Sequence, residues 1–256
     1  MTASTSERAA RTVGAVGRVA LFVPCFVDQF YPRVAIAALT VLERLGFAVD
    51  VPESAVCCGQ PAANAGFARA GDAALGALAS AYARADRVVV LSGSCAAHVR
   101  AHAAGRVAGR AVEFAAFLHD DIGVDAVAAL GARLPRRVGL HIGCHGLRGL
   151  GLARPTELQV PPFNKLRALL ETVRGVEFAD LARPDECCGF GGTFAVAQPA
   201  LSAKIGRDRL RDYTASGADV VVSTDMSCMM HLGGLAHRAG VSLPMVHLAE
   251  VIAGDS

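Results

Sequence analysis

Arg18-Val-Ala-Leu-Phe-Val-Pro-Cys25 is repeated 119 residues later as Arg137-Val-Gly-Leu-His-Ile-Gly-Cys144. Each copy is a short apolar run, rich in β-branched residues, that ends in a cysteine. Runs of this length and composition are typical of buried parallel strands. We therefore expect a strand near the start of each of two related halves, with a cysteine just beyond its carboxyl end.

The repeat continues at two further places. Cys57-Cys58-Gly59 matches Cys187-Cys188-Gly189, and the segment 85–98 matches the segment 218–231. The offset between the copies grows from 119 to 130 and then to 133 residues, so the second copy carries small insertions. All eight cysteines fall on the repeat, four in each half. Thiols that only filled a hydrophobic core would not sort in this way.

Helical patterns separate the expected strands. The helices are predicted at 34–45, 67–83, 165–173 and 200–213, and the strands at 19–23, 47–51, 88–91, 138–142 and 220–222. This alternation predicts an α/β fold, with two similar Rossmann-like halves that each contain a mostly parallel sheet and arose by internal duplication. The predicted domains are residues 18–133 and 134–256, preceded by a flexible tail at 1–17. The cysteines would then lie where open α/β sheets bind their ligands.

Composition excludes some classes of function. The chain of 256 residues has no tryptophan, only 5% aromatic residues, a net charge of +2 and no basic run, which argues against a nucleic-acid partner. The apolar stretch 19–27 is too short to cross a bilayer, so no transmembrane segment is expected. Eight cysteines without an export signal are more typical of metal or redox sites in the cytoplasm than of disulfides.

The cysteines are the candidate metal ligands. Four soft thiolates in each half suit an iron–sulfur cluster or zinc. Adjacent cysteines favour a cluster, because neighbouring side chains diverge and reach two irons more easily than one ion. Zinc in one of the two sites and a vicinal disulfide remain alternatives. The predicted ligands are Cys25, Cys57, Cys58, Cys95, Cys144, Cys187, Cys188 and Cys228.

Residues next to the cysteines are candidates for supporting roles. Gly59 and Gly189 would let the backbone turn sharply, and Gly191 would expose an N–H group that can donate to cluster sulfides. His98 and His231 occupy equivalent positions of the repeat. Each is a candidate cofactor-binding residue, either as a further ligand or as a proton-transfer partner. The alternative is a polar residue on the first turn of a helix.

The cysteine pattern and its surroundings resemble the cysteine-rich CCG-domain family, which includes a cysteine-rich component of heterodisulfide reductase and the iron–sulfur subunit of glycolate oxidase. The resemblance is nearest to the lactate-utilization members and covers residues 18–252. It is carried by Pro24-Cys-Phe-Val-Asp28, Cys57-Cys-Gly-Gln-Pro-Ala62 and Cys187-Cys-Gly-Phe-Gly-Gly-Thr-Phe194. The fuller family pattern ends each half in Cys-x-x-Cys and holds a non-cubane [4Fe–4S] cluster. Here His98 and His231 occupy the last position, which leaves the cluster type and nuclearity open.

The resemblance implies an iron–sulfur electron-transfer subunit, with one [4Fe–4S] cluster per half, in a cytoplasmic complex that oxidizes L-lactate to pyruvate. The implied partners are a ferredoxin-like iron–sulfur subunit and a further subunit of the lactate utilization complex. The first alternative is a heterodisulfide or thiol reductase subunit that acts on a substrate sulfur at the cluster. The second is a zinc-bound structural scaffold. No catalytic residue is assigned, and Arg148 is read either as a carboxylate clamp or as a surface ion pair.

Overall fold

The computed structural model describes residues 17–52, 57–103 and 105–254. Apart from Gly17, the predicted tail at 1–17 lies outside the described residues. Two four-stranded sheets, both entirely parallel, have the matching strand orders β2-β1-β3-β4 and β6-β5-β7-β8. They confirm the predicted fold class of two similar α/β halves. The first half is the β1–β4 sheet with its helices, and the second half is the β5–β8 sheet with its helices.

The strands are β1 (Gly17–Phe22), β2 (Phe47–Asp50), β3 (Val88–Val90), β4 (Ala111–Glu113), β5 (Arg137–His141), β6 (Glu177–Phe178), β7 (Val220–Ser223) and β8 (Met245–His247). The α-helices are α1 (Cys25–Phe30), α2 (Pro32–Arg44), α3 (Gln60–Asn64), α4 (Ala68–Ala81), α5 (Gly93–His102), α6 (Arg106–Arg110), α7 (Phe114–Ala116), α8 (Val124–Ala128), α9 (Lys165–Leu170), α10 (Phe194–Ala197), α11 (Pro199–Ala215), α12 (Met226–Arg238) and α13 (Leu248–Ala253). Two π-helical turns, η1 (Phe117–Ile122) and η2 (His145–Gly149), and one 3₁₀ turn, η3 (Thr156–Leu158), complete the set.

The strand order places a binding region in each half. From β1 the chain moves to β2 on one side and then to β3 on the other, and β5, β6 and β7 follow the same path. Ligands of open parallel sheets bind beyond the carboxyl ends of the strands at which this direction reverses. The binding regions of this protein are therefore expected beyond β1 and β3, and beyond β5 and β7.

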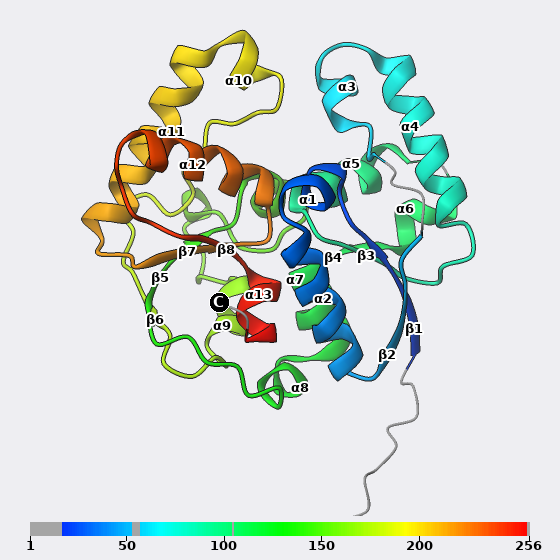
Figure 1. The fold of residues 1–256 in the computed structure, drawn as a ribbon, viewed down its shortest axis with the longest axis horizontal. Coiled ribbons are helices and arrows are strands. Elements are labelled where there is room, and N and C mark those ends of the chain that lie inside the picture. The colour runs from blue at the N-terminus through cyan, green and yellow to red at the C-terminus, as the bar shows by residue number, and fades with distance from the viewer. Residues whose placement is uncertain (1–16, 53–56, 104, 255–256) are drawn as a thin grey trace, which may run out of the picture.

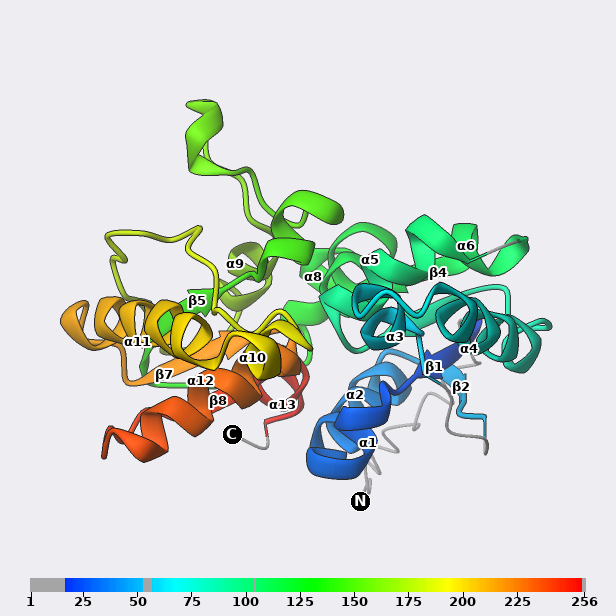
Figure 2. The same cartoon turned by 90° about the horizontal axis from the view of Figure 1, so that it is seen from above.

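The two halves lie side by side, and their helical arms project in the same direction (Figure 1). One arm consists of α3 and α4, and the other consists of α10 and α11. In the second half a hairpin also projects from the body of the molecule, and its base is an antiparallel bridge between Ala153 and Asn164 (Figure 2). This hairpin belongs to the insertion that the repeat offsets indicated. Within the described residues, no helix has the length and apolar character needed to cross a bilayer.

One hydrophobic cluster extends through both halves. It contains Val19 and Leu21 of β1, Val138 of β5, and Ile252 of α13, all of which are almost fully buried. Helix α13 packs against α2 of the first half. The boundary predicted between residues 133 and 134 stays a prediction, because the core is shared across it.

A buried carboxylate joins the two halves. Asp225 precedes α12 and is 2% exposed. It accepts hydrogen bonds from the backbone N–H of Ser94 at 2.8 Å and from the hydroxyl of Ser92 at 3.2 Å. Ser92 and Asp225 hold equivalent positions of the repeat and form a backbone bridge with each other, so a local two-fold axis runs between them. A buried carboxylate is tolerated only where hydrogen bonds replace its hydration, and these bonds therefore fix how the halves meet.

Replacing Asp225 with alanine is expected to lower the free energy of unfolding of the metal-free protein by about 1–3 kcal/mol, because buried donors such as the Ser94 N–H lose their acceptor. Urea denaturation measures this change. The control is Asp72→Ala on the exposed face of α4, which should change the free energy by less than about 0.5 kcal/mol. Equal effects of the two substitutions would contradict the role given to Asp225.

Candidate metal centre

All eight cysteines line one cavity of about 150 Å³ between the two halves. All of them are free thiols. Cys25 begins α1, Cys95 and Cys228 lie in the first turns of α5 and α12, and Cys144 directly precedes η2. The adjacent pairs lie in the loops before α3 and α10. The prediction that the cysteines follow the carboxyl ends of strands is confirmed.

Helix geometry favours negatively charged sulfur at several of these positions. The first turn of a helix has free N–H groups and the positive end of the helix dipole, so it stabilises a thiolate. Cys95 and Cys228 each occupy the third residue of a helix that follows a central strand. Both are buried, so each would present its sulfur to the cavity from a helix end that is shielded from water.

The sulfurs of the first half form a connected series. Cys57 is hydrogen-bonded to both Cys25 and Cys58, and Cys58 lies 3.2 Å from Cys95, measured between their Sγ atoms. The hydrogen bonds from Cys25 and Cys58 lower the pKa of Cys57 far below its usual range. The pKa of Cys25 is raised, first by the hydrogen bond of Cys25 to Cys57 and then by burial. These hydrogen bonds therefore favour the thiolate form, which binds metal, at Cys57.

The second half repeats this series. Cys187 is hydrogen-bonded to Cys144 and Cys188, and Cys188 is hydrogen-bonded to Cys228. The bonds from Cys144 and Cys188 again lower the pKa of Cys187, which is the equivalent of Cys57. The two halves thus offer equivalent sulfur arrangements to one cavity.

The glycines after the adjacent cysteines are required by both conformation and space. Gly59 and Gly189 have φ values of 85° and 86°. A Cβ atom would lie 2.5 Å from the carbonyl oxygen of Gly71 at the first position, and 2.6 Å from that of Ser202 at the second. The N–H of Gly59 donates to Cys57 Sγ at 3.4 Å, and the N–H of Gly189 donates to Cys187 Sγ at 3.3 Å. Gly191, with φ 56°, lines the cavity.

His98 and His231 are not among the residues that line the cavity. The His98 ring is buried in α5, with its centroid 4.7 Å from that of His102. The Nε2 atom of His231 lies 3.4 Å from the hydroxyl of Ser202. Burial lowers the pKa of both imidazoles, so they are neutral near pH 7. Their role at a centre stays a prediction.

Gln60 and His145 are among the polar residues that do line the cavity. Gln60 Nε2 lies 3.3 Å from His145 Nε2, and this contact connects the first half to the second. Arg148, by contrast, pairs with Glu157 at 2.7 Å in a half-exposed ion pair. For Arg148, the interpretation as a surface ion pair is confirmed.

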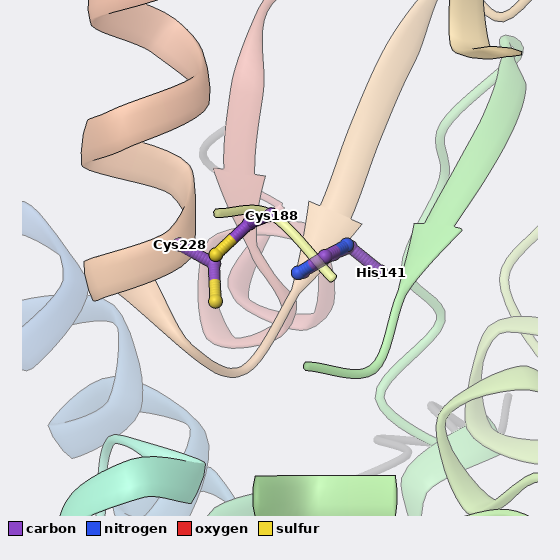
Figure 3. A group of neighbouring side chains, drawn as sticks. All are labelled: His141, Cys188 and Cys228. Atoms are coloured by element: carbon purple, nitrogen blue, oxygen red, sulfur yellow. The ribbon is translucent and has the colours of Figure 1, made fainter. Parts of the chain in front are cut away.

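His141 was not among the site residues expected from the sequence. This residue ends β5 and is 1% exposed. A nitrogen of its ring points toward the sulfurs of Cys188 and Cys228 (Figure 3), and one ligand atom from each of the three residues lies within 4.8 Å of the others. Burial, followed by the charge of Arg209, lowers the pKa of His141 to about 3, so the imidazole is neutral. The sequence signal that could have indicated His141 was the repeat, because it places this histidine where the first half has Phe22.

The profile of the Cysteine-rich domain (CCG) matches residues 19–100 and, a second time, residues 138–233. The chain belongs to the cysteine-rich CCG-domain family. It is 38% identical to Lactate utilization protein A of Geobacillus thermodenitrificans, over 92% of this chain and 98% of that protein. It is 37% identical to Lactate utilization protein A of Shouchella clausii, over 91% of this chain and 98% of that protein.

Solved structures add nothing to this family assignment. The match to an allantoin racemase from Pseudomonas fluorescens spans 93% of this chain and 87% of the racemase chain, but its TM-score is 0.28 and its sequence identity is 13%. The repeated CCG match, by contrast, has the same two-fold organisation as the two sheets. Both CCG units therefore contribute four thiols to a candidate site for a metal ion or an iron–sulfur cluster.

Replacing Gly189 with alanine is expected to destabilise the CCG loop of the second half, because the new Cβ atom meets the carbonyl of Ser202 and the φ angle is left-handed. We expect a loss of about 1–3 kcal/mol in the free energy of unfolding, together with weaker metal binding. The matched control is Gly192→Ala, where φ is also positive but a Cβ atom meets nothing within 4 Å. Urea denaturation and metal titration should both show a larger effect at Gly189.

Proposed function

We propose that this protein is the iron–sulfur electron-transfer subunit of a cytoplasmic complex that oxidizes L-lactate to pyruvate. The observation that carries the proposal is the cavity lined by two equivalent sets of four cysteines. The relatives named Lactate utilization protein A, matched over 98% of their length, support the choice of lactate. The partners in this proposal are a ferredoxin-like iron–sulfur subunit and a further subunit of the lactate utilization complex.

The spacing of the sulfurs in the first half supports a cluster over zinc. The ligand atoms of a tetrahedral zinc–thiolate site lie about 3.8 Å apart, because each Zn–S bond is about 2.3 Å long. Among the described residues, three ligand atoms gather within 4.8 Å only at His141, Cys188 and Cys228. Among the described residues of the first half, no three ligand atoms meet this 4.8 Å limit, which favours a centre with several metals over one zinc ion.

The chain supplies ligands, burial and hydrogen-bond donors to such a centre. The eight cysteines would hold it, and the N–H groups of Gly59 and Gly189 already donate to the sulfurs of Cys57 and Cys187. Donors to sulfur and exclusion of water both tune the potential of an iron–sulfur centre. When bound, an iron–sulfur cluster accepts and releases single electrons. Oxidation of L-lactate to pyruvate releases two electrons and two protons, so one such centre in each half would match the number of electrons.

Metal analysis tests the proposal directly. Protein purified without oxygen is expected to be brown and to contain several irons per chain, with a matching amount of acid-labile sulfide. Iron, zinc and sulfide are measured on the same sample, alongside the visible spectrum. Zinc without sulfide would contradict the electron-transfer role and leave the structural scaffold as the function.

Loss of one cysteine ligand should remove the cluster from the half that contains this cysteine. The variants Cys58→Ser and Cys188→Ser are each expected to keep about half of the iron and sulfide, because the four thiols of the other half are intact. The control is Met229→Leu, a buried residue next to Cys228 that does not line the cavity, and it should load fully. Complete loss of iron in either cysteine variant would contradict two separate centres.

Reconstitution tests the substrate. With both partner subunits present, L-lactate is expected to bleach the visible absorption of the cluster, while the chain alone with L-lactate should not change. D-lactate added to the reconstituted complex is the control for stereochemistry. Reoxidation of the reduced centre by a disulfide, without any bleaching by lactate, would favour the thiol-reductase alternative.

A further inference from the structure

We propose that His141 is a nitrogen ligand of the centre in the second half, and that Tyr213 and Arg209 are the residues that position it. This assignment rests on the proposed function. It makes the two halves chemically different, although their cysteines are equivalent.

His141 is almost fully buried, and only one of its nitrogens has a protein partner. Nδ1 lies 2.9 Å from the hydroxyl oxygen of Tyr213, whereas Nε2 is buried without a hydrogen-bond partner. Since Nδ1 is engaged, the nitrogen available to the sulfurs of Cys188 and Cys228 is Nε2, on the side of the ring that faces them (Figure 3). An unpaired buried polar atom is costly, and a metal ion would remove that cost.

The surroundings of Tyr213 suit a metal-binding tautomer of His141. The Tyr213 hydroxyl oxygen accepts a hydrogen bond from Nε of Arg209 at 2.9 Å, and its own proton can go to the carbonyl of Leu140 at 3.3 Å. In that arrangement the hydroxyl oxygen accepts the Nδ1–H of His141, so Nε2 is unprotonated. Histidines that bind metal commonly donate their second ring N–H to an oxygen in this way.

Arg209 connects this histidine to the loop that holds the adjacent cysteines. It is fully buried and pairs with Asp212 at 3.0 Å. It also donates to the backbone carbonyls of Arg183 and Pro184, which precede Cys187 in the chain. The same guanidinium therefore fixes both the hydroxyl that orients His141 and the start of the CCG loop.

The first half lacks this network. Tyr82 donates to the carbonyl of Leu21 at 3.2 Å, which matches the bond from Tyr213 to Leu140. The ring of Tyr82 packs edge-on against Phe22, the equivalent of His141. Two positions near the tyrosine also differ, one four residues before it and one directly before it. Both are apolar in the first half and charged in the second. In the first half they are Leu78 and Ala81, and in the second they are Arg209 and Asp212.

Three coordinated differences at one site argue against chance. Burying an arginine, an aspartate and a histidine costs free energy unless all their polar atoms find partners. Arg209 and Asp212 satisfy each other and the backbone, while Nε2 of His141 is left for a ligand. Because Phe22 offers no ligand atom at the equivalent position, His141 would be a neutral ligand added to four cysteines, and only the second centre would have it. Exchanging this neutral imidazole for a thiolate would make a cluster more negative and lower its reduction potential.

The test uses the whole chain, purified without oxygen and grown with ¹⁵N-histidine. Pulsed electron paramagnetic resonance in the paramagnetic oxidation state is expected to show coupling to a histidine nitrogen, and His141→Phe should abolish it. This variant introduces the residue of the first half, and Tyr213 keeps its bond to Leu140, so it should fold. A coupling that survives His141→Phe and disappears in His231→Ala would overturn the assignment.

A second pair of variants tests the positioning residue. Tyr213→Phe removes the acceptor of the Nδ1–H and should alter the nitrogen coupling and shift the midpoint potential. Tyr82→Phe, the matched control in the first half, should change neither. His141→Cys should keep the iron and lower the potential of one centre, because it adds a thiolate.

The outcomes separate this inference from the proposed function. Normal iron and sulfide without any histidine coupling would overturn the role of His141 alone. A sample without iron and sulfide would overturn the proposed function and this inference with it. Midpoint potentials that stay unchanged in His141→Cys would also overturn it.

Discussion

The buried carboxylate of Asp225 is the interaction on which the arrangement of this protein depends. It caps α12 through the backbone N–H of Ser227 and reaches across to the start of α5, where it accepts from Ser94. Cys95 and Cys228 lie in the first turns of these two helices. A single anion, shielded from water, thus fixes the distance between the two sets of sulfurs. Because the contact joins equivalent positions of the repeat, it also sets the local symmetry.

The close approach of the arms to the cysteine loops is the second constraint. Gly59 touches the backbone of α4 at Gly71, and Gly189 touches that of α11 at Ser202. Any side chain at these glycines would push the helices outward and move the adjacent cysteines away from the cavity. Sulfur positions are therefore set by backbone packing and not by side-chain rotamers alone, which suits a rigid metal centre.

Much of the fold could be predicted from the repeat, because apolar strands and periodic helices leave clear local signals. The cysteine positions at strand ends followed from the same pattern. The single shared cavity could not be predicted, since it depends on how one half packs against the other through Ser92 and Asp225. The role of His141 could not be predicted, because this residue lies at the end of an apolar strand and a single polar residue there carries no periodic signal. His98 and His231 do not line the cavity, and their role at a centre stays a prediction.

The contact between α2 and α13 has a consequence for biosynthesis. Arg44, at the end of α2, donates to the carbonyl of Ala253, which lies 209 residues further along the chain. Val251 and Ile252 of α13 are fully buried in the same cluster as Val41. At about 5–20 residues per second, a ribosome needs roughly 10–40 s to synthesise the intervening chain. During that time the apolar face of α2 lacks the helix that covers it in the finished fold, so this face stays exposed until the last residues of the chain are made.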